Sequence, residues 1–80
     1  MEDQTPQLSY GQKAVGTTHN QTGMSEVNKI KELSAALIDE LYKQRADNLD
    51  NCETSAQFTL AIRKIQEGQM WGVKATTWQH

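Results

Sequence analysis

The residues with the clearest chemical potential lie near the start of the 80-residue chain, where Tyr10 is followed by Gly11 and Lys13. An aromatic ring can stack on a nucleobase, and a lysine beside it can bind a phosphate. This combination indicates a candidate site for a nucleotide. The alternative is that Tyr10 is a hydrophobic plug that holds the N-terminal segment against the rest of the fold.

Two further lysines follow a polar loop that contains Gly23. Loops of this kind leave backbone N–H groups free to bind an anion. Lys29 and Lys31 come just after this loop, in the first turns of the next predicted helix, where the helix dipole also favours an anion. The alternative is an ordinary connecting loop followed by two solvated lysines.

Patterns for catalysis or metal binding are weak. The single cysteine, Cys52, and the two histidines could form a nucleophile pair, but nothing beyond their presence supports one. The same residues match no zinc-ligand pattern, and the acids between residues 47 and 53 lack the spacing of a calcium loop. We therefore expect no enzymatic activity, no metal and no cofactor.

Three helices are expected to position the candidate residues. Ser9 followed by Gln12 has the form of a capping box, and Gly16 is suited to end a short helix. Ser25 can cap a long amphipathic helix, and Thr54 or Ser55 can cap the last one. The predicted division is an arm at 1–8, a short helix at 9–15, a loop at 16–24, a helix at 25–44, a turn at 45–54 and a helix at 55–78. Two long helices joined by a short turn make an antiparallel hairpin, so we predict one all-α domain over residues 1–80.

Small residues recur along one face of the last predicted helix. At helical periodicity this face is shared by Ala61, Ile65, Gly68, Gly72 and Ala75. A glycine inside a helix costs about 1 kcal/mol relative to alanine. Close packing of another helix backbone against this face would offset that cost.

The composition also favours assembly. Hydrophobic residues make up 36% of the chain and the mean hydropathy is −0.74. A chain of this length has little core of its own, and a single cysteine allows no internal disulfide. We therefore predict a homo-oligomer whose interface contains the small residues together with Trp71 and Trp78, and Lys74 could extend out of that interface.

The charge and hydropathy of the chain exclude some classes of partner. The net charge of −2 disfavours a protein that coats DNA or RNA. No apolar run approaches the roughly 20 residues of a membrane span. The N-terminus lacks the basic and apolar parts of a signal peptide, so we expect a cytoplasmic protein.

Two segments of the chain carry a family resemblance. LSYGQKAVG, at residues 8–16, with VNKIKEL after the loop, and QMWGVKATTW, at residues 69–78, resemble the two ends of the phage anti-CBASS cyclic-oligonucleotide sponges. The resemblance spans about residues 8–78. It implies an all-helical hexamer in the cytoplasm of the infected bacterial host. Such proteins bind cyclic dinucleotides of CBASS immunity without cleaving them, and some bind cyclic trinucleotides at a separate site.

The resemblance also implies roles for individual residues. It assigns base stacking to Tyr10, and it assigns phosphate binding to a lysine after the loop glycine, which is Lys29 or Lys31. The family's second pocket, near the loop glycine and with an arginine from the last helix, corresponds to Gly23 and Arg63.

Three other functions stay open on the sequence alone. The related Thoeris-type sponges bind cyclic ADP-ribose isomers and share the helical hairpin. A helical interaction module would bury its apolar sides against a host protein. An enzyme would degrade the nucleotide rather than hold it.

The small-residue face generates a direct prediction. We expect Gly68→Leu to prevent assembly, because a large side chain cannot fit where two helix backbones approach each other. Size-exclusion chromatography tests this, and elution at the parental volume would contradict the close-packing interpretation.

Overall fold

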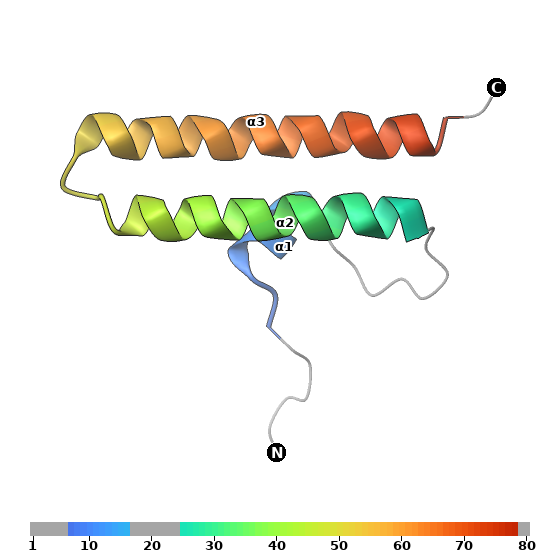
Figure 1. Cartoon of the computed structure of the whole chain (residues 1–80), viewed down its shortest axis with the longest axis horizontal. Helices are drawn as coiled ribbons and strands as arrows, with labels where there is room; N and C mark the ends of the chain where they lie inside the picture. Colours follow the sequence, from blue (N-terminus) through green and yellow to red (C-terminus); the bar gives the residue numbers. More distant parts are fainter. Residues whose placement is uncertain (1–6, 17–24, 79–80) are drawn as a thin grey trace, which may run out of the picture.

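The computed structural model describes residues 7–16 and 25–78, and these residues form three helices (Figure 1). They are α1 (Tyr10–Val15), α2 (Ser25–Ala46) and α3 (Cys52–Thr76). No strand occurs in this part of the chain, so the predicted all-α class is confirmed. Gly23 lies outside the described residues, as do most of the predicted arm and loop.

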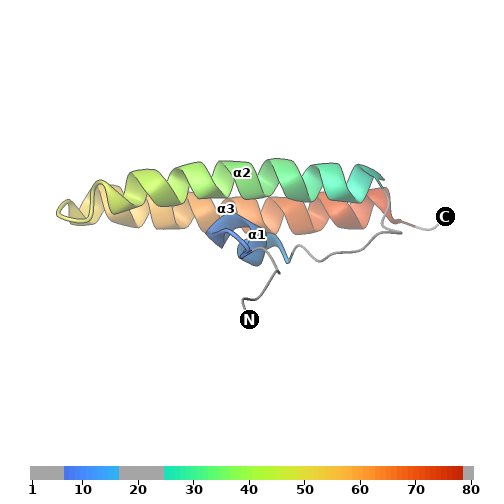
Figure 2. The same cartoon turned by 90° about the horizontal axis from the view of Figure 1, so that it is seen from below.

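The two long helices form an antiparallel hairpin, and α1 lies on one side of it (Figure 2). The α1 helix contacts both long helices, and mainly α2. The buried core has one or two residues from each helix: Val15, Ala35, Ile38 and Ile62. This core is small, because most of each long helix has only one neighbour.

The predicted capping of α1 is confirmed. The Ser9 hydroxyl accepts a hydrogen bond from the Gln12 backbone N–H (3.0 Å), and the Ser9 N–H donates to Gln12 Oε1 (2.8 Å). Gly16 ends the helix with φ of 72°, a left-handed conformation that glycine adopts without steric cost. A helix of six residues is not stable alone, so α1 depends on its contacts with the hairpin.

The closest of these contacts involves Gly11. A Cβ atom at this position would lie 2.8 Å from the carbonyl carbon of Ala35 and closer still to the carbonyl oxygen. The Gly11 N–H donates to Asp39 Oδ1 at 2.6 Å, and Gln66 Nε2 donates to the Ala14 carbonyl at 3.3 Å. Only a residue without a side chain allows α1 and α2 to approach this closely.

The boundaries of the long helices differ from those predicted. The α3 helix begins at Cys52 and its N-cap is Asn51, not Thr54 or Ser55, because Asn51 Oδ1 accepts from the Thr54 N–H at 3.0 Å. Asparagine is among the best N-cap residues. Several residues of the turn could serve as a cap, however, and the sequence alone did not distinguish Asn51 from them. At the other boundaries, α2 starts with Ser25 as a helical residue and continues to Ala46.

The C-terminal end of α3 also falls earlier than predicted. The hydroxyl groups of Thr76 and Thr77 both donate to the Val73 carbonyl at 2.9 Å. Such side-chain bonds compete with the backbone pattern of a helix. The helix therefore ends at Thr76, and Trp78 lies just beyond it.

The predicted small-residue face meets different surroundings along its length. A Cβ atom on Gly72 would touch the Ile30 side chain of the same chain at 3.6 Å, whereas one on Gly68 would meet nothing within 4 Å. Gly68 lines an open groove of about 290 Å³ between α2 and α3, beside Leu33 and Leu37. These two leucines are 66% and 46% exposed. The groove is one part of this face that a second chain could cover, and the oligomer stays a prediction.

The Gly11 contact predicts a large effect for a small substitution. Gly11→Ala should lower the free energy of unfolding by about 1–3 kcal/mol, because the added methyl group overlaps the Ala35 carbonyl. Thermal unfolding followed by circular dichroism measures this change. Gly68→Ala is the matched control within the single chain, where its methyl group meets no atom within 4 Å. At a protein concentration that keeps the chain monomeric, its stability should stay equal or rise. Equal effects of the two substitutions would contradict the close approach.

The cap of α3 gives a second stability prediction. Asn51→Ala should cost about 1 kcal/mol, because the Thr54 N–H loses its acceptor. Thr54→Ala keeps that N–H and its bond, so it should have a smaller effect. Urea titration of both variants measures these changes in the free energy of unfolding. A larger loss for Thr54→Ala would show that the cap is Thr54 instead.

Candidate functional site

The centre of the candidate site is a pair of stacked tyrosines. Tyr10, the first residue of α1, lies against Tyr42 of α2, with ring centroids 4.3 Å apart and ring planes 15° from parallel. Tyr42 lies seven residues after Ala35, on the same side of α2. The docking of Gly11 on Ala35 therefore also brings the two rings together. Both tyrosines are 41% exposed, so the pair presents aromatic surface to solvent.

A cation lies beside this pair. The Arg45 guanidinium carbon is 5.0 Å from the Tyr42 ring centroid and 5.9 Å from that of Tyr10. Arg45 Nη1 also donates to Thr59 Oγ1 of α3 at 3.0 Å. A guanidinium within about 6 Å of an aromatic ring is attracted to it. We call Tyr10, Tyr42 and Arg45 the aromatic platform, which is tied to all three helices.

The aromatic platform has the chemistry of a nucleotide-binding surface. A half-exposed ring can stack on a base without regard to base identity, and a guanidinium or ammonium can bind phosphate. Within residues 7–16 and 25–78, no group of three or more metal-ligating side chains comes together. No helix among these residues is long and apolar enough to cross a membrane.

The predicted phosphate-binding lysines occupy different places. Lys13 is exposed in the last turn of α1. Lys31 of α2 reaches the C-terminal end of α1, where its Nζ donates to the Gly16 carbonyl at 3.3 Å. A cation there also interacts favourably with the helix dipole. Lys29 is exposed near the start of α2. The structure thus joins Lys31 to α1 but at the opposite end from Tyr10.

The predicted second pocket lies partly outside the described residues and stays a prediction. Arg63 is exposed on α3, one helical turn after Thr59. Its expected partner Gly23 lies outside the part of the chain that the structure describes.

Sequence reasoning missed Tyr42 and Arg45. The predicted helix at 25–44 contains Tyr42 and the predicted turn at 45–54 contains Arg45, but neither residue is among the predicted site residues. The signal that could have found them is a pair of small residues, Gly11 and Ala35, which allows two helices to approach closely. Once Gly11 is placed on Ala35, helical spacing puts Tyr42 near Tyr10.

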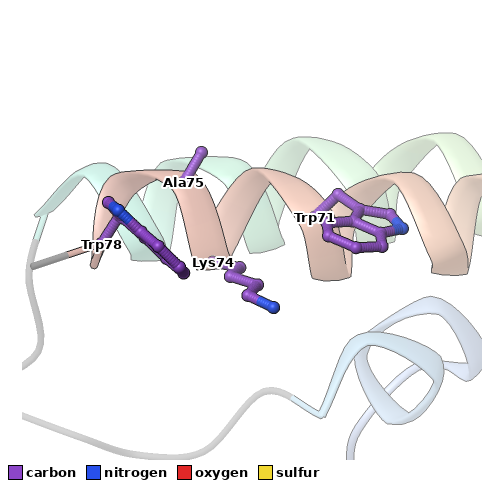
Figure 3. A pocket seen from close by; sticks show the side chains of 4 residues that line it. All are labelled: Trp71, Lys74, Ala75 and Trp78. Carbon is purple, nitrogen blue, oxygen red and sulfur yellow. The ribbon is translucent and has the colours of Figure 1, made fainter.

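A second exposed aromatic cluster lies near the end of α3, on a surface predicted to be an oligomer interface (Figure 3). Trp71 and Trp78 are 62% and 59% exposed, and the Lys74 ammonium lies 5.1 Å and 5.6 Å from their rings. These three residues and Ala75 line a shallow hollow of about 420 Å³. Figure 3 shows Lys74 between the two indoles. The cluster leaves a large apolar surface uncovered in the single chain.

Comparison with known proteins agrees with this architecture. The sequence model of the family described as "Acb2/Tad1, hairpin domain" matches residues 10–77. Comparison with curated proteins and with solved structures gives no match. The matched range begins at Tyr10, contains all three helices and includes the whole aromatic platform. The chain therefore belongs to the Acb2/Tad1 hairpin family, the family of anti-CBASS and anti-Thoeris sponges.

Proposed function

We propose that this chain binds a cyclic dinucleotide messenger of CBASS immunity and holds it without cleaving it, in the cytoplasm of a bacterium infected by a phage. The observation that carries the proposal is the half-exposed Tyr10 ring, set beside Tyr42 and Arg45 at the start of the family match. A cyclic trinucleotide at a separate site that includes Arg63 is a further part of the proposal.

Each part of the ligand has a candidate partner. The exposed side of Tyr10 stacks on a base. The phosphates are bound by cations near α1, and the candidates are Lys13, Lys29, Lys31 and Arg45. Gly11 contributes by its lack of a side chain, since it lets α1 lie close to α2.

Sequestration requires no chemistry on the ligand. The free messenger falls below the level that activates the immune effector only when the sponge is abundant and its Kd lies below that level. Cys52, the one cysteine, is exposed at the start of α3, outside the aromatic platform. We therefore expect the bound nucleotide to be released chemically unchanged.

Assembly as a homo-oligomer, a hexamer by family resemblance, is part of the same proposal. The exposed surfaces at the Gly68 groove and at Trp71 and Trp78 would be covered by neighbouring chains. A site shared by two chains would present two Tyr10 rings to the two bases of one two-fold ligand.

The family description itself supports a second candidate ligand. It covers the Tad1 proteins together with Acb2, so a cyclic ADP-ribose isomer of Thoeris signalling is the alternative. Such a ligand also combines a base with phosphates, and the same platform could bind it.

The direct test is titration calorimetry of the full chain with 3′,3′-cGAMP, followed by heating the complex and analysing the released nucleotide by HPLC. The proposal expects tight binding and intact ligand. A cleaved nucleotide would identify an enzyme. Binding to a cyclic ADP-ribose isomer alone would favour the Thoeris signal, and no binding to any cyclic nucleotide would favour an interaction module.

The stacking role of Tyr10 gives the first binding prediction. Tyr10→Ala should raise the Kd by about 5- to 150-fold, since a base–aromatic stack contributes about 1–3 kcal/mol. Tyr10→Phe keeps the ring and should bind nearly as the parent does. Size-exclusion chromatography should show the parental oligomer for both. Equal binding by all three proteins would refute base stacking on Tyr10.

The proposed binding of phosphate by lysines gives the second binding prediction. Lys29→Ala and Lys31→Ala should each raise the Kd by about tenfold or more if the side chain binds phosphate. Lys31→Ala should in addition lower the melting temperature, because it removes the bond to Gly16. Lys43→Ala, which removes an exposed charge elsewhere on α2, is the control for net charge. The lysine whose loss matches this control is excluded as a phosphate ligand.

A further inference from the structure

We infer that Tyr42 is a positioning residue for nucleotide binding, which holds the Tyr10 ring in the orientation that a base requires. This inference rests on the proposed function and deepens it. Tyr42 is not among the residues that the sequence or the family resemblance assigns to the site. Its evidence is the geometry of the aromatic platform.

The stacked geometry leaves one side of Tyr10 for a ligand. The rings are nearly parallel, and the centroid distance of 4.3 Å corresponds to an offset stack. One side of the Tyr10 ring is therefore occupied by Tyr42. The side chain is still 41% exposed, so the aromatic surface open to a base is the side turned away from Tyr42.

The position of Tyr10 in the chain explains why it needs support. It is the first residue of a helix of only six residues, and the next residue that is buried is a glycine. A side chain at such a helix end has few neighbours within its own helix. Tyr42 supplies a neighbour from near the C-terminal end of α2, a helix of 22 residues.

Arg45 extends this support to α3. Its guanidinium lies beside both rings, and its hydrogen bond to Thr59 connects the pair to the third helix. The Thr59 hydroxyl is itself held by the Ser55 carbonyl at 3.1 Å. The Tyr10 ring is thus part of a connected set of contacts that is already formed in the free protein.

Such pre-organisation has a predictable effect on affinity. A side chain that becomes ordered only when the ligand binds lowers the affinity, by about two- to tenfold for one side chain. Tyr42 removes this loss because the Tyr10 ring is ordered beforehand. Loss of Tyr42 should therefore weaken binding through Tyr10, without removal of any direct contact with the nucleotide.

The test is a double-mutant cycle measured by calorimetry with 3′,3′-cGAMP. Tyr42→Ala should raise the Kd about two- to tenfold, while Tyr42→Phe, which keeps the stack, should restore parental affinity. In a Tyr10→Ala background, Tyr42→Ala should have no further effect. Leu49→Ala, which truncates a side chain 68% exposed in the turn, is the control for loss of apolar surface. An equal loss in both backgrounds would mean that Tyr42 contacts the ligand itself, and would overturn the inference.

A second measurement examines the stack in the free protein. Ring-current shifts of the Tyr10 ring protons in NMR spectra should be present in the parent and in Tyr42→Phe and absent in Tyr42→Ala. Parental shifts in Tyr42→Ala would overturn the inference even if the double mutant binds too weakly to titrate. If the parent binds no cyclic nucleotide, the proposed function fails, whereas parental binding that Tyr42→Ala leaves unchanged contradicts the positioning role alone.

Discussion

The close approach of Gly11 to the Ala35 carbonyl is the contact on which the rest of the structure depends. The α1 helix is too short to persist alone, and its place on the hairpin is set by this contact, by the Asp39 acceptor and by the burial of Val15. Without this contact, the small core would lose the contribution of α1, which is Val15. The same contact brings Tyr10 to α2, so the stability of the fold and the assembly of the candidate site have a common physical origin.

The aromatic platform shows how a chain with few aromatic residues can build an exposed aromatic surface beside a cation. Tyr10 and Tyr42 stack, and Arg45 holds a position beside both rings through Thr59. None of the three side chains is buried. Each contact is individually weak, and the arrangement depends on their sum. This arrangement is consistent with the proposed function, in which stacking and charge would hold a polar ligand.

Much of the apolar surface is left uncovered by the single chain. Leu33 and Leu37 line a groove beside Gly68, and Trp71 and Trp78 stand on the outer side of α3 around Lys74. Exposed patches of this extent commonly mark sites of association. The proposed oligomer would cover this exposed apolar surface, and the assembly itself stays a prediction.

The sequence by itself determined the number, type and order of the helices and the family, but not the exact boundaries of the long helices. Local features can be read from spacing, and they include the capping box, the Gly16 stop and the amphipathic pattern of α2. The type of Tyr10 and its neighbours in the sequence made it a candidate, and its role in binding stays a prediction. The N-cap at Asn51 was missed because several residues of the turn could serve as a cap, and only the hydrogen bond to Thr54 distinguishes them. The partnership of Tyr10 with Tyr42 and Arg45 was decided by tertiary structure alone. It joins residues more than thirty positions apart, and their distance depends on how deeply α1 docks, which a missing Cβ atom on Gly11 controls.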